Sequence, residues 1–174
     1  MKKVLLPVLM LVMAFAAIAA NAAEAPTYGL TSEGVGPVKM NMLIKDLPKS
    51  VEGLYDAFTI SEDMDGHLLV FTLNGEKVME ARARYDRWDV GNDETLAIYL
   101  IKVSSKSVVG IDIKGKLYGV GDNIKTLITN KSVKRVNANR YTYKDVVIDV
   151  TNSNGASTIK SIEFELKEEE VEWP

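Results

Sequence analysis

The sequence predicts an α+β fold in which short helices pack on one face of an antiparallel β-sheet, arranged as two tandem repeat units. First, apolar residues recur with a period of two over several long stretches, as in half-buried strands. Second, short apolar stripes with helical spacing, Leu43–Leu47 and Ile124–Ile128, precede the two main groups of these stretches. Third, turn residues such as Asn74-Gly75 separate the alternating segments.

The N-terminal residues have the pattern of a secretory signal peptide. A basic head, Met1–Lys3, is followed by an apolar run, Val4–Ala20, and by small residues around Ala22. A retained membrane anchor is the alternative, but a spanning helix needs about 20 apolar residues and this run is borderline. We predict a signal peptide over 1–22, a flexible leader over 23–31, an α+β domain over 32–166 with units of about 32–105 and 106–166, and an acidic tail over 167–174.

Composition narrows the classes of partner. The chain has 174 residues, no Cys and a formal net charge of −3. Removing residues 1–22 with their two lysines leaves 152 residues and a net charge of about −5. An acidic surface is not expected to bind nucleic acid, which selects net basic surfaces. With no second apolar segment, the mature protein is expected to be periplasmic or secreted and not integral to the membrane.

The first half of the chain alternates turns with short elements. Gly34–Pro37 is expected to form a turn and Val38–Met40 a short edge strand. Asn41 has a side-chain oxygen that can cap a two-turn helix over Leu43–Leu47, and Pro48 ends this helix.

The next segment, Val51–Phe58, has helical spacing weakened by Gly53, so we expect a turn or short helical piece that places Leu54 and Tyr55 in the core. Strands are predicted over Ala57–Ser61, His67–Leu73, Lys77–Tyr85, Thr95–Ser104 and Val108–Ile113, with a hairpin turn at Asn74-Gly75.

The second half opens with another short helix. Asp122 is expected to cap it, Ile124 to Ile128 to form its apolar stripe, and Asn130 to end it in a left-handed conformation. The predicted sheet has about seven or eight strands in total. Its last members are Val133–Val136, Tyr141–Val150 and Ser157–Leu166, the last with Ile162, Phe164 and Leu166 on the buried face.

The two helical stripes suggest a duplication. Ile44–Leu47 matches Ile124–Leu127 at three of four positions, and 124 lies 80 residues after 44. A Gly-Val pair precedes each stripe and strands follow each, which is the signature of an internal repeat. Chance agreement of two short amphipathic segments is the alternative.

This order of a Gly/Val turn, a short capped helix and a strand meander is similar to the repeat of the β-lactamase-inhibitor protein and to the small outer-membrane lipoproteins of the barrel-assembly machinery. The stretch from Gly36 to Pro48, followed by Gly53-Leu54-Tyr55, resembles a group of uncharacterised exported proteins of Bacteroidales-type bacteria. The resemblance implies binding through a sheet face or loops and no catalysis. The chain lacks the lipidated Cys and the disulfides of the first two families, so the resemblance concerns architecture.

No catalytic, cofactor-binding or metal-binding residues are predicted. His67 is the only His, and every Ser-His or Cys-His system would depend on it. At the start of a strand it is expected at the rim, and nearby Ser61 has no nucleophile-elbow context. The acidic clusters Asp63–Gly66 and Asp86–Glu94 suit turns better than a twelve-residue calcium loop.

Two groups of residues are candidates for partner contact. Tyr85, Arg87 and Trp88 are of the types enriched at interface hot spots; the alternative is that Trp88 folds back over the sheet edge. The second group is a basic patch, interpreted as a solvated face or as a contact for an anionic surface, and it comprises Lys131, Lys134, Arg135, Arg140 and Lys144.

The sequence therefore favours a non-enzymatic exported protein that binds an unknown protein or envelope component through the sheet face or the Trp88 loop. The alternative is a small-ligand or lipid binder in the cell envelope, which would need a deep apolar cavity between sheet and helix. A hydrolase is the least favoured class, since it would need titratable groups clustered around His67 or a carboxylate pair in a cleft.

Overall fold

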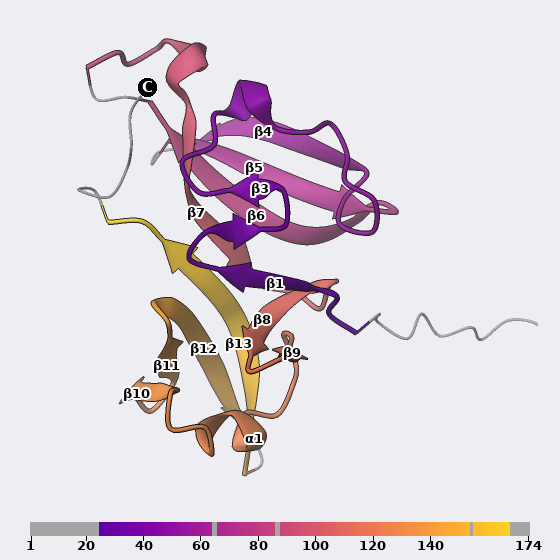
Figure 1. Cartoon of the computed structure of the whole chain (residues 1–174), viewed down its shortest axis with the longest axis vertical. Helices are drawn as coiled ribbons and strands as arrows, with labels where there is room; N and C mark the ends of the chain where they lie inside the picture. Colours follow the sequence, from indigo (N-terminus) through magenta and orange to yellow (C-terminus); the bar gives the residue numbers. More distant parts are fainter. Residues whose placement is uncertain (1–24, 64–65, 86–87, 154, 168–174) are drawn as a thin grey trace, which may run out of the picture.

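The chain folds into two β-sheets, of eight and five strands (Figure 1). The computed structural model describes residues 25–63, 66–85, 88–153 and 155–167. Strands make up 55% of the structure and helical turns 7%. The predicted signal peptide and all of the predicted acidic tail except Lys167 lie outside the described residues.

The eight-stranded sheet consists of two antiparallel meanders that meet at their last strands. Its order is β10-β11-β12-β13-β7-β6-β5-β4, and Ile101 lies opposite Phe164 where the meanders join. The first meander comprises β4 (Ala57–Asp63), β5 (Gly66–Leu73), β6 (Glu76–Arg84) and β7 (Ala97–Val103). The second comprises β10 (Lys134–Asn137), β11 (Arg140–Tyr143), β12 (Val146–Ser153) and β13 (Ala156–Glu165).

The five-stranded sheet has the order β3-β2-β1-β8-β9. Its strands are β1 (Tyr28–Thr31), β2 (Gly34–Val35), β3 (Val38–Lys39), β8 (Val109–Ile113) and β9 (Lys116–Tyr118). β1 pairs parallel with β8, whereas the other pairs are antiparallel. Residues 28–31 were expected in the flexible leader, yet Leu30 is only 1% exposed in this sheet.

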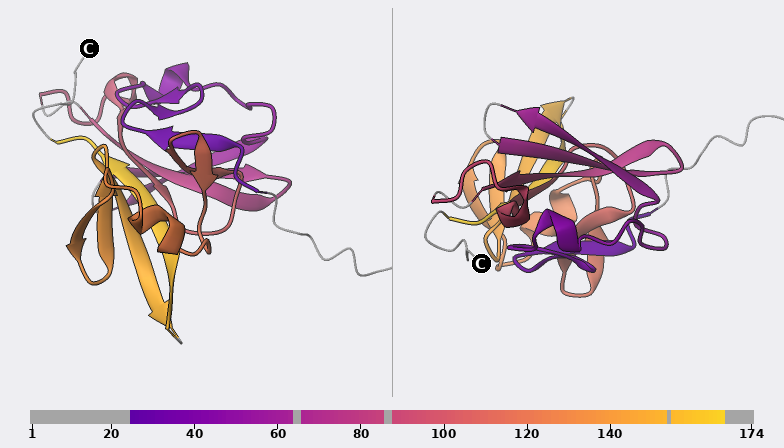
Figure 2. Two further views of the ribbon diagram at one scale, coloured as in Figure 1. Left: turned by 60° about the horizontal axis from the view of Figure 1, so that its bottom comes forward. Right: turned by 90° about the horizontal axis from the view of Figure 1, so that it is seen from above.

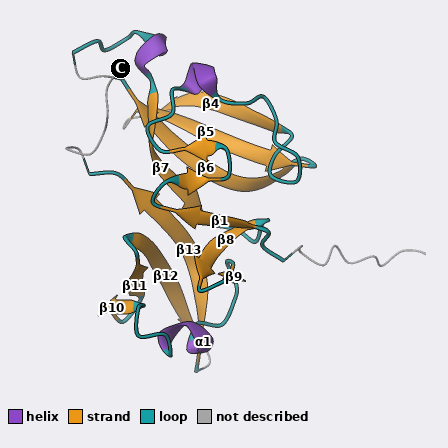
Figure 3. Cartoon of the chain, viewed as in Figure 1, coloured by secondary structure: helices purple, strands orange, loops and turns teal. Residues whose placement is uncertain are grey.

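The predicted α+β class is wrong, because the helical segments do not form a layer on the sheet (Figure 3). They are the 3₁₀ turns η1 (Ile44–Asp46) and η2 (Asp93–Thr95) and the helix α1 (Lys125–Ile128). None exceeds four residues. Forming the first turn of a helix is unfavourable, and only the hydrogen bonds of a longer helix offset this cost. Apolar stripes as short as these therefore remain single turns between strands.

The predicted caps also differ. Asn41 has φ 62° and does not cap η1, whose N-cap is Leu43 and has no side-chain hydrogen bond. Asp122 accepts a hydrogen bond from a backbone N–H three residues earlier, and the N-cap of α1 is Ile124. Asn130 does not have a positive φ; its side chain instead accepts the backbone N–H two residues later, which begins a turn.

The predicted repeat is not supported. Gly34–Val35 forms strand β2, whereas Gly119-Val120 lies in a loop. The matched stripes also differ, since η1 is a 3₁₀ turn and α1 is a short α-helix. Strands on both sides of the predicted unit boundary share each sheet, because β1 pairs with β8 and β7 with β13.

Most strand predictions are confirmed within a few residues. The hairpin at Asn74-Gly75 is present with φ values of 54° and 81°. Tyr141–Val150, predicted as one strand, is divided between β11 and β12, because Lys144 and Asp145 form a turn with φ values of 47° and 69°. Leu54 and Tyr55 are 0% and 1% exposed, as expected for residues that fill the core.

The buried cluster contains residues of both sheets. Figure 2 shows the ribbons of the two sheets from two further directions. One row of residues in register on the inner face of the eight-stranded sheet is fully apolar: Leu69, Ala81, Ile101 and Phe164. Leu30, Val35 and Ile111 of the smaller sheet belong to the same buried cluster. The smaller sheet removes the apolar side chains on one face of the larger sheet from water. Such burial stabilises the fold by about 25 cal/mol per Å² of apolar surface.

Candidate binding face

The other face of the eight-stranded sheet, here called the open face, carries a mixture of charged and apolar side chains. Side chains alternate between faces along a strand, so residues in register with one another share a face. Most of these residues are half-buried, in contrast to the fully buried inner row. One row in register crosses six strands and comprises Thr59, Val70, Glu80, Lys102, Glu163 and Val147.

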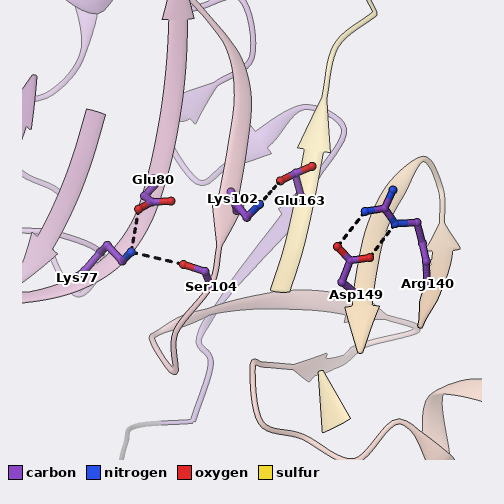
Figure 4. Close-up of polar contacts among 7 residues, drawn as sticks. All are labelled: Lys77, Glu80, Lys102, Ser104, Arg140, Asp149 and Glu163. Carbon is purple, nitrogen blue, oxygen red and sulfur yellow. Dashed lines mark hydrogen bonds and ion pairs between the residues drawn. The ribbon is translucent and has the colours of Figure 1, made fainter. Parts of the chain in front are cut away.

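Opposite charges pair along the open face (Figure 4). Lys102 Nζ lies 2.8 Å from Glu163 Oε2, across β7 and β13. Arg140 donates two hydrogen bonds to Asp149, at 2.7 and 3.0 Å, and these bonds hold the pKa of the Asp149 carboxyl below its usual value. Such partly exposed pairs add little stability, but they fix the orientation of their side chains. A further pair is Lys77 with Glu80, at 2.8 Å.

A shallow cavity of about 740 Å³ lies near the middle of the open face. Leu68 and Leu100 contribute its apolar lining, and Arg82 lies between them in register. Arg84 lies at the same cavity with its guanidinium carbon 4.7 Å from the centroid of the Tyr99 ring. Burial raises the pKa of the Tyr99 hydroxyl, although the neighbouring Arg82 opposes this shift. The cavity thus combines apolar surface with oriented guanidinium groups.

The predicted contact residues lie in the loop between β6 and β7. The Tyr85 hydroxyl donates a hydrogen bond to Asp93 Oδ1 at 2.9 Å, which raises the pKa of Tyr85. The Tyr85 ring also packs edge-on against His67, with 5.2 Å between centroids. Trp88 is 82% exposed, so it does not fold back against the sheet edge. Arg87 lies outside the described residues. The structure therefore places Tyr85 and Trp88 in different environments.

His67 is not part of a nucleophile system in the described structure. It lies opposite Glu62 in the register of β4 and β5, whereas Ser61 lies opposite Leu68 on the other face. No hydrogen bond links Ser61 to His67 within the described ranges, and His67 Nδ1 is buried without a hydrogen-bond partner there. The arrangement lacks the nucleophile-to-base contact that a Ser-His mechanism requires.

The acidic loop before β7 is organised by local bonds. Asn92 donates to Asp89 Oδ2 at 2.6 Å and accepts the backbone N–H of Glu94 at 3.1 Å, which caps η2. Glu94 also pairs with Lys45 at 2.5 Å, and this contact raises the pKa of Lys45. Across the described residues, no three metal-ligating side chains gather in one place. The Asp63–Gly66 cluster lies partly outside those residues.

The basic patch is spread over separate environments. Lys131, Lys134 and Arg135 are exposed, whereas Arg140 is paired with Asp149. Lys144 lies with Nζ 5.4 Å from the centroid of the Tyr143 ring. A different cavity, of about 530 Å³, lies where β1, β8 and the β11–β12 turn meet, and charged residues contribute to its lining: Glu33, Asp112, Lys114 and Lys144. This lining differs from the deep apolar cavity that a lipid binder needs.

The fold and the open face define a mainly antiparallel two-sheet β protein. Among the described residues, the smaller sheet packs on one face of the larger sheet and no strand packs on its open face. No protein-family model, curated protein or solved structure shows significant similarity to the chain. In the part of the chain that the structure describes, no helix has the length and apolar character needed to cross a membrane.

Proposed function

We propose that the chain is a non-enzymatic binding protein that holds a protein partner on the open face of the eight-stranded sheet. The observation that carries this proposal is the row of charged and apolar side chains that crosses β4 to β12 in register. A solvated sheet face is usually dominated by polar side chains, whereas this one also carries three neighbouring half-buried apolar residues, Leu68, Val70 and Leu100.

The charge balance of the face favours a protein over a polyanion. Lys102 is offset by Glu163, and Arg82 lies near Glu165 through the shared neighbour Leu100. An anionic membrane or a nucleic acid would be attracted by a net basic surface. Alternating charges around apolar positions are common in protein interfaces, where they fix the register of the partner.

The place of action remains the one expected from the N-terminal residues, which have the pattern of a signal peptide over 1–22. The partner is accordingly expected to be an envelope or extracellular protein.

Site-specific photocrosslinking tests the proposal directly. A photoreactive amino acid is introduced at Leu100 and at Val147 on the open face, at Trp88 in the loop and at Val136 on β10. We expect one discrete crosslinked protein from positions 100 and 147 in cells that express the chain, and none from 136. A product from position 88 alone would assign binding to the Trp88 loop and overturn the role of the face.

The crosslinked protein, once purified, allows a quantitative test. Leu100→Lys places a further charge in the cavity lining and is expected to weaken binding at least about tenfold, since a desolvated charge must then be accommodated. Leu100→Met conserves volume and is expected to bind within about twofold of wild type. Equal affinities for the two variants would exclude the cavity from the interface.

A further inference from the structure

Strand β4 is an edge of the eight-stranded sheet with a free side. In the described part of the chain, all backbone pairing of β4 is to β5, over seven residues in unbroken register. Every second residue of such a strand directs its N–H and C=O groups away from the sheet. β4 therefore presents a row of unpaired backbone groups beside Ile60, which is 46% exposed.

Edge strands are ordinarily protected by charges, Pro, bulges or short length. None of these devices is present over Ala57–Ser61, which has the sequence Ala-Phe-Thr-Ile-Ser. Its register with β5 has no shift, whereas β5 and β6 are shifted after Phe71. These five residues, which precede the acidic Glu62 and Asp63, form an unprotected stretch of edge that is a template for another strand.

The chemistry of this edge is close to palindromic about Thr59. Small residues, Ala57 and Ser61, lie two positions away on each side, and apolar residues, Phe58 and Ile60, lie one position away. Antiparallel pairing of two identical strands about Thr59 places Phe58 opposite Ile60 twice and Ala57 opposite Ser61 twice. Aromatic residues opposite β-branched residues are favourable cross-strand pairs. The segment Ala57–Ser61 of this edge is thus complementary to itself.

Contacts within the protein hold Phe58 and Ile60 at the edge where a second strand would meet them. Phe58 is held by the Phe71 ring, with 5.5 Å between centroids, and by Tyr55, at 6.2 Å. Ile60 lines a cavity of about 430 Å³ together with the apolar residues Ile44 and Leu96. A strand added beside β4 would bring a second Phe side chain against Ile60 and remove its exposed surface from water.

We propose that β4 pairs antiparallel with β4 of a second copy of this chain, with Thr59 opposite Thr59 on a two-fold axis. The interface is isologous, and the two eight-stranded sheets become one continuous sheet. Their open faces then join at Thr59, which lies at the margin of that face. Because the contact is a single strand pair, a weak and concentration-dependent dimer is expected.

The same register predicts an unusual salt response. Glu62 lies opposite Asp56 of the second copy at each end of the pair, and both are acidic and exposed. Added salt screens this repulsion, so dimerisation is expected to strengthen between about 10 mM and 500 mM NaCl. Dimerisation that weakens over this range would contradict the register.

Cysteine crosslinking tests the contact, since the chain has no Cys. Thr59→Cys places two thiols across the axis, where paired Cβ atoms lie about 4.5–5.5 Å apart, and mild oxidation is expected to give a disulfide dimer. Val136→Cys on β10 is the matched edge control and is expected to remain monomeric under the same conditions. Equal crosslinking at the two edges would overturn the proposal.

Charge variants test both the occupant and the register. Sedimentation of the purified protein is expected to show a monomer–dimer equilibrium that Thr59→Lys and Thr59→Glu each weaken at least about tenfold. Thr59→Ser is the conservative control and should dimerise like wild type. Mixing the Lys and Glu variants is expected to restore dimers, since opposite charges then meet on the axis.

Two further results would contradict this proposal. Wild-type protein that stays monomeric up to about 0.5 mM, a concentration at which even weak single-strand contacts associate, would exclude self-pairing. Charge variants that do not rescue each other would exclude Thr59 opposite Thr59. Neither result bears on the open face, because binding of the crosslinked partner is measured with the Leu100 variants.

Discussion

The two edges of the eight-stranded sheet are built differently. β4 has seven residues in unbroken register with its neighbour, and Ala57–Ser61 carries no charge. β10 has four residues, all exposed, with Lys134 and Arg135 among them. Its register with β11 shifts between Arg135 and Asn137. β10 therefore has three of the features that prevent strand pairing, whereas the first five residues of β4, Ala57–Ser61, have none of them.

The edges also differ in how the core holds them. Tyr55 packs edge-on against Phe71 on the adjoining strand, with 4.9 Å between centroids, and its hydroxyl donates to Pro48 O at 2.6 Å. On β10, Val136 is 58% exposed. The aromatic contacts of Tyr55 and Phe71 thus support β4 from the core, whereas all four residues of β10 are exposed to solvent. An edge that is to receive a strand needs such support, because a frayed strand must be ordered before it can pair.

The largest expected effect is loss of the support beneath β4. Phe71 is 0% exposed and contacts both Tyr55 and Phe58. Phe71→Ala is expected to lower the free energy of unfolding by about 3–5 kcal/mol, through lost burial and the cavity that remains. Urea denaturation followed by far-UV circular dichroism measures this change, because Trp88 is already 82% exposed in the folded protein.

The matched substitution at the other edge is Val136→Ala. Its side chain is largely in water, so the change is expected to stay within about 0.5 kcal/mol. Comparable losses of stability at Phe71 and Val136 would mean that the core supports the two edges equally.

A smaller effect is expected at the turn next to the β10 side of the sheet. Lys144 and Asp145 both have positive φ, a conformation for which Asn-Gly is the preferred pair. Asn74-Gly75 already provides this pair in the β5–β6 hairpin. The double variant Lys144→Asn, Asp145→Gly is expected to stabilise by about 1 kcal/mol, since it relieves two strained residues. The midpoint of thermal unfolding measures the gain in stability. A lower midpoint would show that the contact of Lys144 with the Tyr143 ring stabilises the fold by more than the positive φ of Lys144 destabilises it.

The hairpins were the part of the fold most accessible to sequence reasoning. Strict alternation, such as Glu80 and Arg82 against Met79 and Ala81, specifies a strand and both of its faces at once. The same alternation contained the signal for the open face, because its charged positions fall on one side of the sheet. What it did not contain was the register that brings Glu80, Lys102 and Glu163 into one row, since that depends on pairing between distant segments.

The helices and the small sheet were not accessible in the same way. The stripes at Leu43–Leu47 and Ile124–Ile128 have helical spacing, but this spacing cannot show whether the first turn extends into a longer helix. β1 gave no clear pattern, because four residues at Tyr28–Thr31 are ordered by parallel pairing with β8, about 80 residues away. Long-range pairing of this kind overrides local preference, and it places Leu30, which was predicted to lie in the leader, in the core.

The smallest effect is expected at the Arg140–Asp149 pair, which braces the β11–β12 end of the open face. Arg140 lowers the pKa of Asp149 in the folded protein, so the stabilisation is present above the unfolded pKa of about 3.8 and is lost as pH falls through the folded value. Asp149→Asn is expected to cost about 0.5 kcal/mol near pH 7, because both groups are partly exposed, and almost nothing near pH 2. Urea denaturation at the two pH values measures the difference, with Arg135→Gln on β10 as the control that should change neither. If Asp149→Asn lowers the free energy of unfolding equally at both pH values, the Asp149 side chain acts through packing and not through its charge. The Arg140–Asp149 pair would then not stabilise the β10 side of the sheet electrostatically, in contrast to the aromatic contacts that support β4.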